Sequence, residues 1–523
     1  MHWLALHLPL LPLEAFCATL GPAEAARPIA LVAQHRVAQV NPAAAQRGLR
    51  AGIKRATAQA LAADLLLAES HPGREAAALL AVAHAALAFT PAVVLHDTQT
   101  VLLDVHSTLR LFGGAAALQR QLLAALAPLG HQLQTAAAPT ALGAALLAQW
   151  FPRRAAGLVN ADLTSGPHST NLQALQALLV QAPVWLLGPG REHGEALQGM
   201  GLHTLSDLLA LPRAGLARRF GQELLNELDR ALGLQADPRT WVELPATFDA
   251  RLELFARADT TDQVLHGASV LLARLVAWAQ ARQARVAAFT LRMLHEKARY
   301  AAPPATELRV ELAEPALDAA HLQGLLRERL GRLELVAPTL DLQLRCSHLV
   351  AGHAPNGELF PTRASETLGL TRLLERLRAR LGDEQVLRLV AVADHRPECA
   401  SRWVPAVGPV GGSATGPSAA ASASALVDPG LPLHRPAWLL SEPLPLAERD
   451  AMPWWQGRAL QLVSGPERIE TGWWDDASVA RDYFIARAED GCLVWVYRSR
   501  MPAAPGVLGQ AGEPTWHLQG LFA

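Results

Sequence analysis

The chain has 523 residues and 51% hydrophobic content, so it can bury several cores, and about three to five domains are expected. Its formal net charge of −1 excludes a globally basic nucleic-acid-binding protein, so any contact with nucleic acid must come from local basic patches or backbone amides. The 4 cysteines are far apart and form no Cys-x-x-Cys pair, which argues against a zinc site or a disulfide framework and fits a reducing cytosol.

Residues 1–180 alternate apolar strand-like runs with alanine-rich helical runs, which predicts an α/β domain. The opening segment MHWLALHLPLLPLEAF lacks a basic start and is too short and proline-broken to span a membrane. It is therefore predicted to be a buried strand that runs into a helix. The predicted strands of this domain are 4–8, 93–106 and 131–138, and its predicted helices are 74–89 and 115–129.

The rest of the chain divides by composition. Residues 181–240 contain short helical runs broken by glycines, whereas 246–346 follows the α+β order strand, helix, strand, strand, helix, strand. Residues 347–403 are predicted to form a loop and an α/β extension. The segment 404–434 is rich in Gly, Pro, Ser and Ala and almost uncharged, so too few large side chains are present to offset the entropy of ordering and a flexible linker is expected. Residues 435–523 regain tryptophans and turn signals, which predicts an ordered C-terminal region.

Three segments, taken in order and spacing, resemble the Y-family of lesion-bypass DNA polymerases. They are the opening strand leading to Glu14, VLLDVHSTLRLFGG (101–114) and VWLLGPGREHGEALQGMGLHTLSDLLALP (184–212). Together with the pattern of 246–346, the resemblance covers roughly residues 1–346. It implies a multidomain α/β and α+β fold with palm, fingers, thumb and little-finger domains, followed by a C-terminal extension.

The metal-binding positions of that family carry no carboxylates in this chain. Y-family polymerases use two divalent cations, and such hard cations require carboxylate oxygens. Alignment with the family places the first metal-binding aspartate on Ala5, the next aspartate-bearing position on His7, and the Asp-Glu pair on Gln99 and Thr100. Asp97 is the only nearby acidic candidate.

The nucleotide-binding positions of the family are lost as well. The tyrosine and arginine that hold the triphosphate fall on Pro42 and Ala45, and the lysine near the phosphates falls on Thr140. None of these side chains supplies the charge-assisted bonds that a triphosphate needs. The resemblance therefore implies a non-catalytic chain with no metal and no cofactor.

Two other interpretations stay open. One is a divergent but active translesion polymerase that uses Glu14, Asp97 and Asp104 in a rearranged site. The other is a helix-hairpin-helix DNA-binding module on an unrelated α/β domain, which leaves the palm-like order unexplained. Convergence of two or more carboxylates in the palm would favour the active polymerase.

The thumb-like region is the first candidate for DNA contact. Gly188, Gly190, Arg191 and Gly201 resemble helix-hairpin-helix positions, where glycines let the backbone approach a phosphate and helix N-termini offer free N–H groups. A plain helix connection favours the same residues and is the alternative. Because the region is not basic, weak and sequence-independent binding is expected.

The little-finger-like region is the second candidate for DNA contact. It carries a basic stretch whose proposed phosphate contacts are Arg282, Arg285, Arg292 and Lys297. Such contacts are electrostatic and salt-sensitive. A solvated charged face is the alternative.

The segment GHAPNGELFPTR (352–363) resembles bacterial sliding-clamp ligands, whose leucine and phenylalanine fill an apolar pocket. The candidate clamp contacts are Asn356, Glu358, Leu359 and Phe360, with Asn356 at the family's glutamine position. A chance Leu-Phe pair in a loop is the alternative. A second Leu-Phe pair, in WHLQGLF (516–522), has a leucine where the glutamine is expected.

The tail, residues 465–500, is predicted to form a turn, a short helix and a β-hairpin. Trp473, Trp474 and Tyr483 are candidates for a partner-binding surface, and a small core that includes Trp495 is the alternative. The tail and the missing carboxylates resemble ImuB-type proteins, the inactive Y-family members of bacterial damage-induced mutagenesis cassettes. This resemblance implies a cytoplasmic, nucleoid-associated adaptor for error-prone translesion synthesis on damaged, primed template DNA. The implied protein partners are a sliding clamp, an ImuA-type RecA-like accessory protein and an error-prone C-family polymerase.

Overall fold

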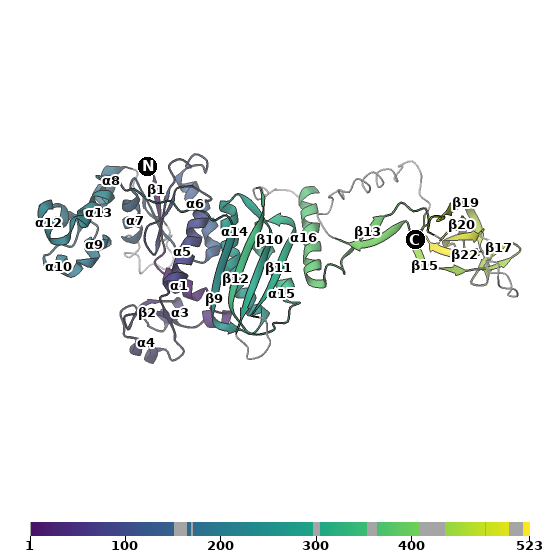
Figure 1. Ribbon diagram of the computed structural model, residues 1–523, viewed down its shortest axis with the longest axis horizontal. Coiled ribbons are helices and arrows are strands. Elements are labelled where there is room, and N and C mark those ends of the chain that lie inside the picture. Colours follow the sequence, from purple (N-terminus) through teal and green to yellow (C-terminus); the bar gives the residue numbers. More distant parts are fainter. Residues whose placement is uncertain are drawn as a thin grey trace. The chain divides into compact units, whose positions relative to one another are not determined.

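The computed structural model describes residues 2–150, 165–168, 171–296, 304–352, 363–406, 435–475, 477–500 and 516–522, with the backbone alone at 165–168, 347 and 363–368. The chain divides into two compact units, Met1–Ser365 and Glu366–Ala523. The first unit combines an α/β part, a helical part and an α+β part, and the second unit is mainly β (Figure 1). The predicted multidomain α/β and α+β class is confirmed.

The opening strand lies at the centre of a five-stranded palm-like sheet. The strand order is β5-β6-β1-β7-β8, and β1 is antiparallel to both of its neighbours. Helices α5 and α6 pack on one face of this sheet and α7 on the other, which explains why the opening run is apolar at successive residues. The strands are β1 (Trp3–His7), β5 (Val93–Leu95), β6 (Thr100–Asp104), β7 (Gln134–Ala138) and β8 (Ser165–His168). The helices are α1 (Leu11–Cys17), α5 (Pro72–Ala86), α6 (Ala115–Leu126), the 3₁₀ turn η1 (Ala127–Leu129) and α7 (Ala141–Trp150).

The predicted single strand at 93–106 is wrong, because this segment forms a hairpin of β5 and β6. The Asp97 carboxylate turns the chain by accepting a hydrogen bond from the Gln99 amide at 2.8 Å. Aspartate favours such turns because its side chain bonds the backbone two residues ahead. The polar interruption HDTQ in the apolar run was the signal of this turn.

A small three-stranded sheet occupies the fingers-like region, and the apolar patterns did not predict it. Its strand order is β3-β2-β4, with two antiparallel strands and one short parallel partner. Its strands are β2 (Ile29–Ala33), β3 (Arg36–Val40) and β4 (Leu66–Glu69), and its helices are α2 (Pro22–Ala25), α3 (Pro42–Gln46) and α4 (Arg55–Leu61). Strands of four or five residues give too short an alternation to be recognised in the sequence.

The thumb-like region is a cluster of short helices that shares a hydrophobic core with α7. Its elements are α8 (Leu172–Leu179), η3 (Val184–Leu186), α9 (Gly188–Glu192), α10 (Gly194–Gly199), α11 (Leu205–Leu209), α12 (Arg213–Phe220) and α13 (Gln222–Leu232). The predicted short helices broken by glycines are thus present.

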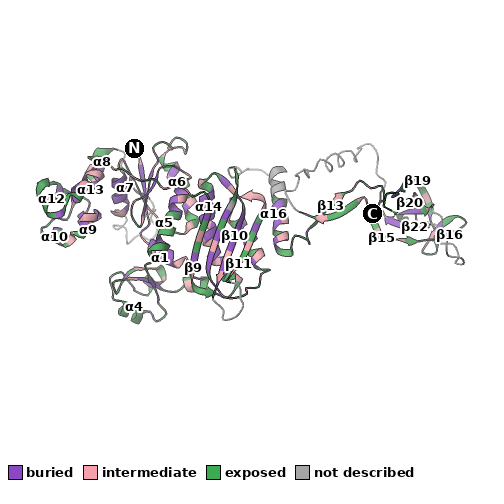
Figure 2. Cartoon of the chain, in the orientation of Figure 1, coloured by how far each residue is buried: buried purple, intermediate pink, exposed green. Residues whose placement is uncertain are grey.

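The little-finger-like region has the predicted order strand, helix, strand, strand, helix, strand. Its sheet runs β11-β10-β12-β9, with α14 and α15 packed on one face, and Figure 2 shows buried residues along these elements. The elements are β9 (Phe248–Ala258), α14 (Thr261–Ala281), β10 (Ala284–His295), β11 (Ala305–Ala316), α15 (Ala319–Leu330) and β12 (Thr339–Ala351). Among the described helices, α14 has the length and apolar composition of a membrane span, but 67% of that window is buried inside the protein.

The second unit is built on a five-stranded antiparallel sheet of order β15-β22-β21-β20-β19. Its strands are β15 (Trp438–Pro445), β16 (Ala447–Arg449), β17 (Met452–Trp455), β18 (Arg458–Ala459), β19 (Gln461–Thr471), β20 (Val479–Arg487), β21 (Leu493–Ser499) and β22 (Trp516–Leu521). The β-hairpin predicted in the tail is β20–β21, but the predicted short helix is wrong, since a turn joins β19 to β20.

The described residues on the two sides of the predicted linker belong to one compact unit, Glu366–Ala523. Helix α16 (Arg363–Leu381) is followed by the hairpin of β13 (Leu387–Ala391) and β14 (Ser401–Pro405). Arg396, in the loop of this hairpin, donates hydrogen bonds to both carboxylate oxygens of Asp475 at 3.1 and 2.6 Å. Glu398 in the same loop accepts a hydrogen bond from Arg481 at 2.8 Å. These contacts join the hairpin loop to the five-stranded sheet on the far side of the predicted linker, most of which lies outside the described residues.

Candidate functional site

Ala5 lies in the middle of the palm-like sheet and is sealed from solvent. It pairs with Leu102 on β6 and with Ala136 on β7, and all three residues are 0% exposed. They belong to the apolar cluster that joins the sheet to α7 and the thumb-like helices. A cation could not reach this position, and a carboxylate there would be buried without a partner.

The end of β1 carries a closed network of polar side chains. The His7 Nδ1 atom lies 3.0 Å from the Thr100 hydroxyl, which donates to Asp97 Oδ2 at 3.2 Å. The same Asp97 oxygen accepts from the Gln149 side chain at 3.1 Å, while Asp97 Oδ1 accepts from the Gln99 amide. The Asp97 carboxylate therefore stabilises a turn and one end of the sheet through protein donors.

The two other carboxylates of the rearranged-site alternative lie apart from this network. Glu14 accepts hydrogen bonds from the Gln132 amide at 3.1 and 3.2 Å, and its Oε2 atom lies 3.2 Å from the His131 Nδ1 atom. Asp104 accepts from the His106 amide at 3.0 Å, at the opposite end of β6 from Thr100. Five residues of strand separate those two ends by about 13 Å. The three carboxylates do not converge, which counts against the active-polymerase alternative.

The residues at these positions do not fit the two divalent cations of a Y-family active site. In the described part of the chain, no group of three or more His, Cys, Asp or Glu side chains is placed to hold a metal ion. A two-metal site needs carboxylate oxygens on both cations. Here the aligned positions offer a sealed methyl group at Ala5, a side-chain amide at Gln99 and a hydroxyl at Thr100 that is already bonded.

The nucleotide-binding positions have structural roles instead. Pro42 occupies the first turn of α3, whose N-terminus is capped by the Asn41 side chain, and Ala45 lies on the exposed side of that helix. Thr140 donates its hydroxyl to the Ala231 carbonyl at 2.8 Å and accepts from the Gly143 amide at 3.1 Å. Thr140 thus fixes α7 to α13, a contact that its sequence neighbours did not signal.

The prediction that the backbone amides of the helix-hairpin-helix are free is wrong at Gly188. Its N–H donates to the Glu227 carboxylate of α13 at 2.9 Å. Burial raises the pKa of Glu227, which the Gly188 amide partly offsets. Gly190 is required by packing, since a Cβ there would lie 2.1 Å from the Val184 carbonyl oxygen. Sequence reasoning missed Glu227 because it lies 39 residues from the glycine that it contacts.

The remaining thumb candidates are exposed to solvent. Gly201 adopts a φ of +77° after α10 and has no atom within 4 Å of the Cβ position, so the left-handed turn is what favours glycine there. Arg191 is exposed and donates to the Trp185 carbonyl at 3.3 Å. Both residues stay available to a ligand on this surface.

The little-finger-like sheet has one face that α14 and α15 leave uncovered, which we call the open sheet face. Cross-strand pairing places charged residues from all four strands on it, since directly opposite residues share a face. They are Asp249, Arg251 and Glu253 on β9, Arg292 on β10, Glu307, Arg309 and Glu311 on β11, and Asp341 and Arg345 on β12.

Each arginine of the open sheet face is paired with an acid. Arg251 forms a two-pronged contact with Asp341 at 2.8 and 2.5 Å, and Arg345 lies 3.1 Å from Asp249. Arg292 lies 3.6 Å from Glu307, and Arg309 lies 2.6 Å from Glu311. The face is therefore close to electrically neutral, which limits its attraction for phosphates.

The predicted basic stretch is not one surface. Arg282 caps α14, where it donates to the Pro245 carbonyl at 2.9 Å and lies over the Trp278 ring. Arg285 lies at the start of β10 beside Gly352, whereas Arg292 is on the open sheet face. Lys297 lies outside the described residues.

The predicted clamp contacts, Asn356, Glu358, Leu359 and Phe360, also lie outside the described residues. The second Leu-Phe pair is not a free peptide. Its leucine, Leu521, is the last residue of β22, and Phe522 follows the strand and packs against the aromatic core of the sheet. Leu518, at the position of the expected glutamine, is 1% exposed. The interpretation of 516–522 as a clamp ligand is therefore wrong.

The aromatic residues of the tail divide into a surface pair and a core. Trp473 and Trp474 are 74% and 55% exposed and contact each other edge to face at 4.7 Å. Tyr483 is 1% exposed and stacks on Trp495 at 4.2 Å, so its predicted role in direct partner contact is wrong. Its hydroxyl donates to the Gln519 side chain at 2.6 Å.

The turn that presents the two tryptophans is fixed by Arg396. This arginine bonds Asp475 through both terminal nitrogens and donates to the Ala477 carbonyl at 3.3 Å. Its hydrogen bonds with Asp394 and then with Asp475 raise the pKa of Arg396. Gly472 starts the turn at a φ of +86°. Two exposed tryptophans on a turn held in this way have the character of a preorganised contact surface.

No protein-family model matches the chain. Two curated relatives, both named protein ImuB and from Caulobacter vibrioides strains, are 30% identical to it over 499 residues, covering 91% of this chain and 100% of each relative. Among solved structures, an insertion ternary complex of Dbh DNA polymerase is 15% identical with a TM-score of 0.37. DinB from Sulfolobus solfataricus is 14% identical with a TM-score of 0.35. Each structural match covers 67% of this chain and 100% of the other.

Proposed function

This chain belongs to the ImuB family of Y-family polymerase-like proteins, and on that basis we propose that it serves damage-induced mutagenesis as a non-catalytic, DNA-bound adaptor. The observation that carries the proposal is the state of the palm. Ala5 is sealed between Leu102 and Ala136, and the nearby carboxylates Glu14, Asp97 and Asp104 are bonded to separate protein donors. A chain that keeps the framework without the two-metal chemistry is suited to binding rather than to synthesis.

The proposed assembly joins damaged, primed template DNA to three proteins in the cytoplasm, at the nucleoid. A sliding clamp would contact Leu359 and Phe360, flanked by Asn356 and Glu358. An ImuA-type RecA-like accessory protein and an error-prone C-family polymerase would contact the second unit. The exposed Trp473–Trp474 pair supports a partner surface there.

Primer extension tests the non-catalytic role. The full chain is expected to add no nucleotides to a primed template with Mg²⁺ or Mn²⁺, because the residues that the structure describes include no group of carboxylates placed to hold the cations. Asp97→Ala is expected to behave like the unsubstituted chain. Steady nucleotide incorporation that disappears in Asp97→Ala would instead establish a divergent active polymerase and contradict the proposal.

DNA binding is proposed to be weak and salt-sensitive, since the arginines of the open sheet face are paired. Glu307→Gln releases Arg292 from its acidic partner and is expected to tighten binding of primed DNA by about 2- to 5-fold at low salt. Arg292→Gln is expected to weaken it by a similar factor. Fluorescence anisotropy across a salt series measures both changes.

Arg120→Gln, at an exposed position on α6, is the control for the loss of one positive charge. It is expected to leave affinity unchanged. Equal affinities for Glu307→Gln, Arg292→Gln and the unsubstituted chain would move the DNA-binding surface away from the open sheet face.

A further inference from the structure

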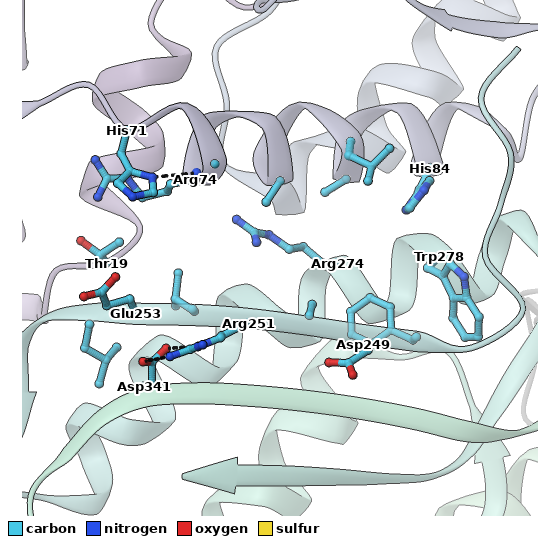
Figure 3. Close-up of a pocket in the computed structure, with 18 of the residues that line it drawn as sticks. Thr19, His71, Arg74, His84, Asp249, Arg251, Glu253, Arg274, Trp278 and Asp341 are labelled. Atoms are coloured by element: carbon cyan, nitrogen blue, oxygen red, sulfur yellow. Dashed lines mark hydrogen bonds and ion pairs between the residues drawn. The ribbon is translucent and has the colours of Figure 1, made fainter. Parts of the chain in front are cut away.

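A cavity of about 900 Å³ lies within the first unit, between α5 and the edge strand β9 (Figure 3). One face of α5 lines it with Arg74, Ala77, Leu80 and His84, at the spacing of successive helical turns. The residues of β9 from Phe248 to Phe255 form the opposite wall. The volume is in the range of cavities that hold small organic ligands.

Arg274 of α14 is one of the residues that line this cavity. It is 8% exposed, and Figure 3 shows its guanidinium in the gap between α5 and β9. It makes no hydrogen bond or ion pair with any other residue that the structure describes. Burial without a compensating charge lowers the pKa of Arg274. Proteins pair nearly all buried charges, because an unpaired one is costly to desolvate.

The residues next to Arg274 on α14 are apolar and buried, which is an unusual environment for an arginine. Leu271 and Trp278, one turn before and one turn after it on α14, are fully buried, as is the adjacent Leu275. Their side chains belong to a core that favours an apolar residue at position 274. Packing alone therefore gives no reason for an arginine at this position.

Two of the acids that line the cavity, Asp249 and Asp341, are hydrogen-bonded to other side chains. Asp341 is bonded to Arg251, and Asp249 accepts from Gln343 at 2.7 Å and from Arg345 at 3.1 Å. Both therefore have partners on the open sheet face. Glu253 is drawn at the Thr19 end of the cavity in Figure 3. Burial lowers the pKa of Arg74, and the charges of Glu75 and then Glu253 partly offset this effect. Glu253 is thus a lining carboxylate without a hydrogen bond to any described residue, and the Arg274 guanidinium is the buried donor without one.

Arg74 adds a second donor to the cavity. Its guanidinium lies over the Phe16 ring at 5.3 Å and donates through Nη2 to the Glu69 carbonyl at 3.1 Å, whereas its Nε atom is buried without a partner. Ala77 and Leu80, which follow Arg74 along α5, give the cavity apolar lining.

We propose that this cavity binds a small ligand in which one anionic group, a phosphate or a carboxylate, is attached to a flat apolar body. The anion pairs with Arg274, and the apolar body lies against Ala77, Leu80 and Phe255. Arginine suits both anions because its planar fork forms two parallel hydrogen bonds. A DNA duplex is too wide for a cavity of this volume, so a small molecule is the occupant that fits.

The test compares the full chain with Arg274→Met, which keeps the length of the side chain and removes its charge. The probes are phenyl phosphate, benzoate and inorganic phosphate, measured by calorimetric titration and thermal unfolding. Phenyl phosphate or benzoate is expected to bind the unsubstituted chain, and Arg274→Met to weaken that binding by about 10-fold or more. The preferred probe identifies the anion as phosphate or carboxylate. Arg120→Met is the matched control and is expected to bind normally.

Stability supplies an independent readout. Without any probe, Arg274→Met is expected to melt at a higher temperature than the unsubstituted chain, because a buried unpaired charge is replaced by an apolar side chain. A lower melting temperature with unchanged binding of the probes would make Arg274 a structural residue. Three further results would overturn the proposal: binding of none of the probes, equal binding of inorganic phosphate and phenyl phosphate, or a loss of affinity in Arg274→Met that is confined to primed DNA.

Discussion

Ala5→Asp is expected to lower the free energy of unfolding of the first unit by about 3 kcal/mol or more, without producing polymerase activity. Position 5 is 0% exposed, and its cross-strand neighbours are Leu102 and Ala136. A carboxylate placed there has no hydrogen-bond donor within the apolar cluster and no path for a cation. It must either ionise without a partner or remain protonated, and both states are costly.

The matched control is Ala38→Asp, which makes the same change on an exposed strand position in β3. Calorimetry of the full chain is expected to show a first-unit transition lower by about 5 °C or more for Ala5→Asp, and little change for Ala38→Asp. Primer extension is measured on the same samples. Normal stability in Ala5→Asp together with metal-dependent extension would mean that the palm still accepts a catalytic cation.

Trp473→Ala combined with Trp474→Ala is expected to weaken binding of the accessory protein or the C-family polymerase by about 100-fold, and to leave clamp binding intact. Both indoles are exposed, and the turn that carries them is held by Arg396 through Asp475. Exposed tryptophans in a fixed geometry lose little entropy on binding, so their removal has a large effect. Pull-down of each purified partner measures the loss.

The converse double variant is Leu359→Ala with Phe360→Ala. It is expected to abolish clamp binding and to leave the other two interactions unchanged, because it removes both apolar anchors of the clamp motif. Thermal unfolding is measured beside each pull-down. A collapsed melting transition would show that Leu359 and Phe360 are core residues rather than clamp contacts.

A second pair of exposed tryptophans serves as the control for loss of indole area. Trp403 and Trp438 lie in the same unit and are 64% and 70% exposed. Replacing both with alanine is expected to leave all three interactions intact. If this variant and the Trp473–Trp474 variant lose binding equally, the partner surface is spread over the unit and is not centred on the anchored turn.

Much of the framework could be predicted from the sequence, because it depends on local patterns. The run Trp3–Leu6 is apolar at every position, as expected for a strand buried on both faces. The helical spacing of apolar residues in α5 and α6, and the strand–helix order of 246–346, could likewise be predicted from the sequence. The hairpin at Asp97 and the fingers-like sheet were missed, since a short turn or a four-residue strand carries too little periodicity.

For the candidate binding residues, the sequence predicted the segment in which each lies but not its contacts. The sequence placed Gly188 in a hairpin but could not show that Glu227 occupies its amide. It placed Trp473, Trp474 and Tyr483 in one aromatic segment but could not divide surface from core. Strand alternation in β20 turns Tyr483 inward, whereas the tryptophans fall in the turn before that strand.

By itself the sequence determined which side chains stand at positions 5, 99 and 100: a methyl group, an amide and a hydroxyl, where the family resemblance implies carboxylates. Only the tertiary structure decided where the remaining charges lie. Arg274 is buried in a cavity without an acidic partner among the described residues, whereas Arg292 lies on the open sheet face beside Glu307. The physical reason is that a charge acquires its energy from partners and solvent, and these are brought together by chain segments far apart in sequence.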